Sequence, residues 1–476
     1  MSGIGETRAA QIARLFPSFR EFVDDALFHP EWGYYSTGQV RFGEGGHFDT
    51  YPLALSPLFG RMLARYAHRL WWRAGQPSRF EIGEFGAGNG QLCLDTLVSV
   101  DDLARRDPAW QRFAAALRYR IIERSPSLVV RQRRQLGPLA HRVVWTEADL
   151  AQRAARGTPF APWGLLVANE VLDCLAHHKI VQRDDDEPGV VFVVPVLQQQ
   201  APTHSGRRPL LPDLQPTDRA VPRAELGRIL RDDRLRRHLT FREVTLPLRT
   251  VPGLRPFLRR HYPEFFSTRA AGAGRSAASP HPRAADMRDA KGRNLLGRSG
   301  VYFVCPAIET LIRNSTRLYR CSEALWIDYG DTRAFHLEAP EHRRVFAGPP
   351  RSKATVFRNP GRDDITFMVD FSVVATAAER SGCQVAFYGA QGELARRSGV
   401  RFARQARDLI LRYRTLAWML ALVGVGAERE WQRAGLTWGQ RAAKGGRLRG
   451  YVKRSVDEFL GKRPTPFKLM ILKSAG

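Results

Sequence analysis

Three glycines at alternating positions constrain the fold of this chain more than any other feature of its sequence. Gly86, Gly88 and Gly90 follow an apolar segment at residues 79–85, and a helical pattern begins directly after them. Glycine adopts positive φ values and lets the backbone approach a ligand closely, while the start of the next helix is electropositive. This arrangement predicts a nucleotide-like cofactor at the carboxyl edge of a parallel sheet. A tight strand-to-helix turn without a ligand has the same pattern.

An acidic residue just before the glycines indicates which cofactor the loop binds. The glycines are spaced GxGxG rather than GxGxxG, and Glu84 stands two positions before the first of them. A carboxylate there repels a pyrophosphate and attracts a cofactor with a cationic amino-acid end. The loop therefore favours S-adenosylmethionine over a nicotinamide dinucleotide.

Two further acidic residues follow the next two predicted strands. Glu123 ends the segment 118–123, where a carboxylate can accept hydrogen bonds from both hydroxyl groups of a ribose. Asp149 follows the segment 142–145, where it can accept from an adenine amino group or cap a helix that begins at Leu150. The predicted cofactor-binding residues are Glu84, Gly86, Gly88, Gly90, Glu123 and Asp149.

Polar residues also follow the fourth apolar segment, at residues 165–168. Asn169, Glu170 and Asp173 stand where a strand end faces the reactive group of a cofactor in an open parallel sheet. These side chains suit the orientation of a nitrogen nucleophile, and a helix beginning near Glu170 would put both carboxylates on one face. The alternative is that they only stabilise a helix start. We predict Asn169, Glu170 and Asp173 as the catalytic residues.

Seven apolar segments bounded by turn residues predict the strands of one sheet. They are residues 79–85, 118–123, 142–145, 165–168, 324–328, 384–388 and 467–472. The first four alternate with segments long enough for helices, which is typical of a mostly parallel sheet with helices on both faces. The sequence therefore predicts an α/β fold of the Rossmann-like type.

The order of these segments divides the chain into four predicted parts. Residues 1–75 are expected to form a helical N-terminal cap, and residues 76–175 the first part of the cofactor-binding domain. Residues 176–320 form an insertion between the fourth and fifth strands. It is expected to be partly helical, with a hairpin near 190–197 and a disordered loop near 270–295, rich in Ala, Gly, Ser and Pro. Residues 321–476 supply the remainder of the domain and a basic C-terminal region.

Basic residues are unevenly distributed along the chain. The formal net charge is +27, and 66 of the 74 basic residues are arginine. Residues 201–300 and 401–476 each carry a net charge of +12, so the other 300 residues net only +3. Two basic regions around a nearly neutral core suggest an acidic partner, such as an acidic protein substrate. A solvated, arginine-rich exterior explains the same charge equally well.

Cysteine spacing and hydropathy exclude several classes of protein. The five cysteines lie far apart and form no CxxC pair, which argues against a disulfide framework or a zinc ribbon. No apolar run reaches the ~18 residues that a transmembrane helix requires, and the acidic N-terminal segment argues against a transit peptide. We expect a cytoplasmic enzyme that needs no metal.

Seven short motifs, in this order, resemble those of the MidA-type methyltransferases. They are residues 29–35 (HPxxGYY in the family), 47–60 (DFxTxPExSxxFG), 84–90 (ELGxGxG), 123–126 (VExSP), 168–173 (ANExxD), 328–330 (DYG) and 364–371 (DxTxxVDF). The likeness extends over most of the chain outside residues 200–300. The sequence departs from the family pattern at His47, Ala176 and Met368, among other positions.

The resemblance implies a seven-stranded class I methyltransferase sheet with S-adenosylmethionine as the cofactor. The family's mitochondrial member is a complex I assembly factor and a protein-arginine methyltransferase, so the resemblance implies methyl transfer to a protein arginine. Two alternatives remain open: a cofactor-binding assembly factor with weak or no catalysis, and a nucleic-acid methyltransferase. The sequence shows no basic platform with interleaved aromatic residues, which argues against the second alternative.

Overall fold

The structure of the chain is a computed structural model, and twelve separate ranges of it are described. These are residues 2–40, 56–149, 151, 160–183, 187–198, 211, 217–266, 300–338, 345–347, 355–400, 459 and 467–474. The α-helices are α1 Ser2–Leu15, α2 Phe19–Phe28, α4 Leu58–Arg73, α5 Gln91–Ala104, α6 Pro108–Ala116, α7 Pro126–Leu136, α8 Arg223–Arg231, α9 Asp233–Arg236, α10 Leu254–His261, α11 Ala307–Ser315, α12 Arg333–Glu338, α13 Phe371–Arg380 and α14 Gly392–Ser398. The strands are β1 Phe80–Phe85, β2 Leu117–Glu123, β3 Val143–Glu147, β4 Ala161–Asn169, β5 His178–Gln182, β6 Gly189–Gln198, β7 Asp218–Ala220, β8 Leu239–Pro247, β9 Gly300–Val304, β10 Tyr319–Asp331, β11 Val345–Ala347, β12 Ile365–Phe367, β13 Val369–Asp370, β14 Cys383–Gly389 and β15 Phe467–Ser474.

The central sheet has the strand order β14-β15-β10-β4-β1-β2-β3, and the two-residue strand β13 pairs with β10 beside this path. Strands β10, β4, β1, β2 and β3 run parallel, whereas β15 runs antiparallel to both of its neighbours. All seven predicted strand segments lie in this sheet, so the predicted α/β class is confirmed. The chain moves outward from β1 to β3 and returns to β4 on the other side of β1. Open α/β sheets bind their ligands at such a switch point.

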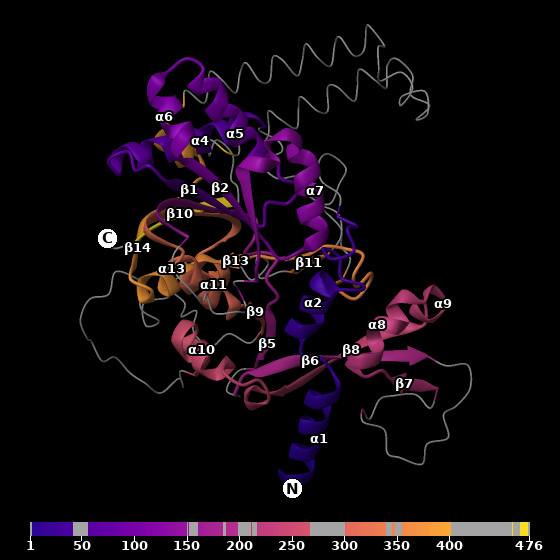
Figure 1. The fold of residues 1–476 in the computed structure, drawn as a ribbon. Coiled ribbons are helices and arrows are strands. Elements are labelled where there is room, and N and C mark those ends of the chain that lie inside the picture. The colour runs from indigo at the N-terminus through magenta and orange to yellow at the C-terminus, as the bar shows by residue number, and fades with distance from the viewer. Residues whose placement is uncertain are drawn as a thin grey trace, which may run out of the picture.

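Residues along the central strands alternate between two apolar layers, as the two-residue period of a strand requires. On β4, Leu165 and Val167 pack into the layer formed with α4 and α5. Leu166 and Ala168, one position along, pack into the layer formed with α11 and α13. Figure 1 shows α4 and α5 on one side of this sheet and α11 and α13 on the other. The sheet is therefore buried on both faces, with its strand ends left for a site.

One aromatic side chain crosses the sheet surface because two strands have glycine beneath it. Tyr319 of β10 is fully buried, and its hydroxyl donates to Glu81 of β1 at 3.1 Å. A Cβ at Gly164 of β4 would lie 2.6 Å from the Tyr319 ring, and one at Gly83 of β1 would clash with its hydroxyl. The glycines thus provide the space that the ring occupies.

The segment between β4 and β10 contributes a second sheet as well as helices. Its strand order is β7-β6-β5-β9, and β8 pairs along nearly the whole length of β6. The apolar run near 190–197, predicted as part of a hairpin, is β6, which is antiparallel to both β5 and β8. Helix α2 packs on this sheet, where Phe22 contacts Phe241 and Phe19 contacts Phe303. Figure 1 shows α1 and α2 beside it, far along the chain from its strands.

Several sequence-based expectations fall outside the described residues. They concern the loop near 270–295, most of the basic C-terminal region, and the family motif at 47–52. The division into four parts stays a prediction. Within the described part of the chain, no helix combines the length and apolarity needed to cross a bilayer.

We expect Gly164→Ala to destabilise the protein by about 1–3 kcal/mol, because the added methyl group meets the buried Tyr319 ring. The free energy of unfolding is measured by urea denaturation. In a Tyr319→Leu background the same glycine substitution is expected to cost less, because the ring is absent. Equal costs in both backgrounds would show that the ring does not set the need for glycine.

Candidate active site

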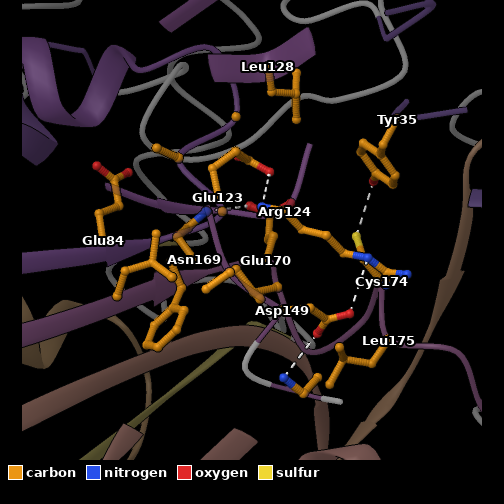
Figure 2. Close-up of a pocket in the computed structure, with 18 of the residues that line it drawn as sticks. Tyr35, Glu84, Glu123, Arg124, Leu128, Asp149, Asn169, Glu170, Cys174 and Leu175 are labelled. Carbon is orange, nitrogen blue, oxygen red and sulfur yellow. Dashed lines mark hydrogen bonds and ion pairs between the residues drawn. The ribbon is translucent and has the colours of Figure 1, made fainter. Parts of the chain in front are cut away.

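A cavity opens at the carboxyl ends of β1, β2 and β4, where the strand order reverses. It encloses about 1160 Å³, counted out to its open mouth. The glycine loop, the turns after β2, β3 and β4, and the end of α2 form its walls. Figure 2 shows Glu84 at one side and Tyr35 with Cys174 at the other. Small-molecule sites of α/β proteins lie preferentially at such switch points, lined mainly by apolar side chains with a few converging polar groups, as this cavity is.

The glycine loop adopts a backbone that other residues would strain. The φ angles of Gly86, Gly88 and Gly90 are 56°, 55° and 87°. A Cβ at Gly86 would lie 3.1 Å from Val171, and one at Gly90 would lie 3.4 Å from Gln132. Glycine is therefore needed for conformation at all three positions, and a side chain at Gly86 would also crowd Val171. Gly86 and Gly88 line the cavity, whereas Gly90 lies behind them as the N-cap of α5.

Glu84 lies at the bottom of the cavity and is 4% exposed. Its carboxylate accepts a hydrogen bond from the Tyr119 hydroxyl at 2.7 Å. Burial raises the pKa of Glu84 to about 7, although the hydrogen bond from Tyr119 opposes this shift. The nearby Glu123 carboxylate also contributes to this raised pKa. In the free protein near neutral pH, this carboxyl group is therefore ionised in only part of the molecules.

Glu123 is held by its own turn and by a glutamine from α7. Its Oε1 accepts from the backbone N–H groups of Arg124 and Ser125, each at 2.9 Å. Its Oε2 accepts from Nε2 of Gln132 at 3.0 Å. The same Gln132 nitrogen also donates to the Gly88 carbonyl at 3.1 Å. Gln132 thus fixes the glycine loop relative to Glu123, a role that its sequence position gave no reason to predict.

Asp149 is paired with an arginine that brings α2 to the rim of the cavity. Nε of Arg124 lies 3.2 Å from the Asp149 carboxylate, and its Nη1 donates to Asp24 at 3.0 Å. The Arg124 guanidinium also lies over the Phe28 ring, 4.0 Å from its centroid. Asp149 accepts from the backbone N–H of Ala151 at 3.1 Å as well. Both interpretations of Asp149 remain, since it caps the local turn and lines the cavity.

The end of β4 forms a tight turn and not a helix start. Glu170 has a φ of 53°, a left-handed conformation that non-glycine residues rarely adopt. Its backbone N–H donates to the Ile327 carbonyl at 2.8 Å, and its Oε1 accepts from Nδ2 of Asn169 at 3.1 Å. The Oδ1 atom of Asn169 is buried and accepts no hydrogen bond from the described residues. Strained residues of this kind concentrate at functional sites.

This turn corrects the expectation that Glu170 and Asp173 share one helix face. A helix does not begin at Glu170, and Asp173 is buried outside the cavity lining. The backbone N–H groups of residues 171–173 instead converge on Oδ2 of Asp328, at 2.9 to 3.2 Å. A single buried carboxylate from β10 thus replaces helical hydrogen bonding as the force that shapes the turn.

Three buried carboxyl groups lie together behind the wall of the cavity. They are Asp173, Asp328 and Asp364, and we call them the acidic cluster. Burial and, after it, the nearby Asp173 carboxyl group raise the pKa of Asp364 to about 8. Burial likewise raises the pKa values of Asp173 and Asp328. The hydroxyl of Tyr35 donates to Oδ1 of Asp364 at 2.9 Å and lies 3.1 Å from Sγ of Cys174. Tyr35 and Cys174 line the cavity, so their side chains separate the acidic cluster from it.

Seven of the nine predicted site residues line this cavity, and Gly90 and Asp173 do not. The lining residues among the nine are Glu84, Gly86, Gly88, Glu123, Asp149, Asn169 and Glu170. Sequence reasoning did not assign a role to Arg124, Gln132 or Cys174. Tyr35 and Asp364 were named only as parts of motifs. Their contacts join segments up to 329 residues apart, which no local pattern reveals.

The sheet order, with an antiparallel β15 and a glycine loop after β1, defines the class I methyltransferase fold. The chain belongs to the family described as "Putative S-adenosyl-L-methionine-dependent methyltransferase", whose sequence model matches residues 62–389. The enzyme is therefore a methyltransferase that uses S-adenosylmethionine. A crystal structure from Burkholderia thailandensis with S-adenosyl-homocysteine bound is similar over 99% of this chain and 94% of its own. Its TM-score of 0.59 at 19% identity shows a shared fold.

Curated relatives match a short part of the chain. The mitochondrial protein arginine methyltransferase NDUFAF7 homolog of Drosophila melanogaster is 36% identical over 77 residues. The mitochondrial protein arginine methyltransferase NDUFAF7 of Mus musculus is 35% identical over 77 residues. Each match covers 16% of this chain and 17% of the relative, so the chain spans about a sixth of the length of these relatives.

We expect the affinity for S-adenosyl-homocysteine to fall by up to about tenfold between pH 8 and pH 6, since Glu84 becomes neutral as the pH falls through its pKa. A neutral carboxyl group no longer attracts the ligand's ammonium group. Glu84→Gln should bind more weakly and lose this pH dependence. Calorimetric titration at both pH values measures the effect, with Glu147→Gln, an exposed glutamate at the end of β3, as the control. A wild-type affinity that is equal at both pH values would contradict this role for Glu84.

We expect the free energy of unfolding of the ligand-free protein to decrease as the pH rises from 5.5 to 8.5. The raised pKa of Asp364 means that its stabilising contribution is complete below the unfolded value of 3.8 and is lost as the pH rises through about 8. Asp364→Asn keeps an acceptor for Tyr35 but cannot ionise. The free energy of unfolding of Asp364→Asn, relative to that of the wild type, should rise by at least about 1.4 kcal/mol across this range. Urea denaturation measures it. The control Asp102→Asn, at an exposed aspartate of α5, should follow the wild-type slope, and a parallel slope for Asp364→Asn would refute the assignment.

Proposed function

We propose that this methyltransferase transfers its methyl group to a guanidino nitrogen of a protein arginine. The observation that carries the proposal is the turn after β4. There Glu170 is held in a left-handed conformation and lines the cavity, beside the buried Oδ1 of Asn169, which accepts no hydrogen bond from the described residues. A carboxylate next to an open amide oxygen provides acceptors for the N–H groups of a planar cation.

The short matches to protein arginine methyltransferases support the same substrate class. They are 34–36% identical over 77 residues, and the family motifs of the sequence point to the same group of enzymes. An arginine substrate also suits the charge at this strand end, because Glu170 lies close enough to raise the pKa of Asp328. A cationic side chain would be attracted to such an acidic environment.

The cavity provides groups for each part of the cofactor. Gly86 and Gly88 would pass along its amino-acid end, with Glu84 facing the ammonium group. The Glu123 carboxylate has lone pairs beyond those used by its own turn and would accept from the ribose hydroxyls. Asp149 would lie near the adenine. S-Adenosylmethionine supplies a methyl group that its sulfonium charge already activates for displacement.

The protein's contribution to the reaction is positioning and charge. Glu170 would bind the guanidinium through paired hydrogen bonds, an arrangement that lysine matches poorly. Holding the positive charge at one nitrogen leaves more electron density on another, and the carboxylate can later accept the released proton. Phe28 and Tyr35 stack with ring centroids 5.1 Å apart, and both line the cavity, where they would exclude water from the reaction. Asp173 acts from behind the cavity wall as part of the acidic cluster.

We expect Glu170→Gln to keep its affinity for S-adenosyl-homocysteine and to lose methyl transfer by about 10²-fold or more. The assay is tritiated methyl incorporation into a lysate of cells that lack the protein, followed by acid hydrolysis and identification of the labelled amino acid. Glu147→Gln is the matched control. Wild-type incorporation by Glu170→Gln would remove this residue from the mechanism.

The same assay separates the proposed activity from its alternatives. Label recovered as methylarginine after hydrolysis supports the proposal. Label that is lost on nuclease treatment would identify a nucleic-acid substrate. A wild-type protein that binds the cofactor but gives no incorporation would favour an assembly role without catalysis.

A further inference from the structure

A second cavity lies between α4 and α14, apart from the cofactor pocket. It encloses about 650 Å³, counted out to solvent. Its described lining is Tyr66, Arg69, Leu70, Arg73, Arg396 and Arg397. Four of these six residues are arginines and none is acidic, so the cavity is strongly electropositive.

The arginines of α4 form a stripe that works against the stability of the helix. Arg61, Arg65, Arg69 and Arg73 are each four residues apart and therefore lie on one face. Like charges at this spacing destabilise a helix by a few tenths of a kcal/mol per pair. The repulsion is visible at Arg65, whose pKa is lowered by burial and then by the charges of Arg61 and Arg69. A ligand bound at Arg69 and Arg73, the two members of the stripe that line the cavity, would relieve part of this repulsion.

The carboxylates near the cavity neutralise only part of its charge. Glu393 pairs with both Arg396 and Arg397, at 2.6 and 2.8 Å, so two guanidinium groups share one carboxylate. Glu323 accepts from the Tyr66 hydroxyl. Arg73 forms no hydrogen bond or ion pair with any residue in the described part of the chain. Arg73 lies exposed in the last turn of α4, where its charge suits the helix dipole and is not neutralised by a carboxylate of the described residues.

The arginines from the two helices are brought together by close packing. The Arg69 guanidinium donates to the Arg397 carbonyl at 2.6 Å, at the end of α14. Gly399, the C-cap of α14, has a φ of 66°, and a Cβ there would lie 2.5 Å from Nη2 of Arg69. The glycine thus provides both the turn and the space that Arg69 needs. Arg69 is fixed in place before any ligand arrives, which lowers the entropic cost of binding.

We propose that this cavity binds a compact, doubly charged oxyanion of the phosphate type. Arginine presents paired N–H donors that match phosphate oxygens, and several arginines converging on one small space suit a single tetrahedral group. An extended polyanion would instead contact charges spread along a surface.

The site is separate from the one used for methyl transfer. Gly60, in the first turn of α4, packs against Asp95 and Thr96 of α5, near the glycine loop. Arg69 and Arg73 follow Gly60 by nine and thirteen residues, which is about 14–20 Å along the helix. None of the described residues that line this cavity lines the cofactor pocket. Binding of the oxyanion is therefore testable without a methyl acceptor.

The test is calorimetric titration of the full chain with inorganic phosphate at pH 7.5, with sodium chloride adjusted to hold the ionic strength constant. The double variant Arg73→Gln/Arg396→Gln should bind phosphate about tenfold more weakly or worse, because it loses two charge-assisted interactions. Arg228→Gln on α8, another exposed arginine, is the matched control and should bind as the wild type does. All three proteins should bind S-adenosyl-homocysteine equally, which verifies that the variants are folded.

Three results would overturn the proposal. They are equal phosphate affinity in wild type and double variant, no phosphate binding above a chloride blank, and binding of a long polyanion such as heparin without binding of phosphate. A parallel titration with glycerol 3-phosphate identifies the source of the group. Tighter binding of the ester or of the free ion would each support the site and would name its natural form.

Discussion

The carboxylate of Asp328 is the contact on which the site depends. It lies at the end of β10, is buried, and accepts three consecutive backbone N–H groups from the turn after β4. Those groups would otherwise be unsatisfied in the interior, at a cost of roughly 1–3 kcal/mol each. Because Asp328 meets this need, Glu170 can leave β4 in a left-handed conformation and line the cavity. The arrangement of polar groups at the end of β4 thus depends on Asp328 from the neighbouring strand β10.

The part of the wall around Tyr35 depends on segments that lie far apart along the chain. Tyr35 follows α2, which is held on the second sheet through Phe22 and Phe241. Its hydroxyl meets Asp364, which lies just before β12. The sheet between β4 and β10 is therefore part of the site's architecture, because it positions the N-terminal segment that closes the cavity. Without it, the cofactor pocket would lack the part of its wall that Tyr35 forms.

The sequence predicted the features that depend on residues close together along the chain. The strands, the glycine loop and the acids at the ends of β1 and β2 follow from apolar runs, turn residues and spacing, and all lie where expected. The turn at Glu170 was not predicted, because a polar strand end is equally compatible with a helix start or a left-handed turn. The choice is made by Asp328, 158 positions away. Arg124 and Gln132 were missed for a similar reason, since their roles come from partners and not from their own neighbourhoods.

Under the proposed function, the acidic cluster would attract a cationic substrate, but burying three ionised carboxyl groups together would be costly. Three carboxyl groups cannot all remain ionised in this space, since burial raises the pKa of each and Asp173 adds to the raised pKa values of Asp328 and Asp364. Their raised pKa values keep part of this charge neutral in the free protein. A guanidinium held at Glu170 would favour the ionised forms again, so binding of the acceptor and release of a proton would be linked. The cluster would then attract a cation without imposing the full cost of buried charge on the empty enzyme.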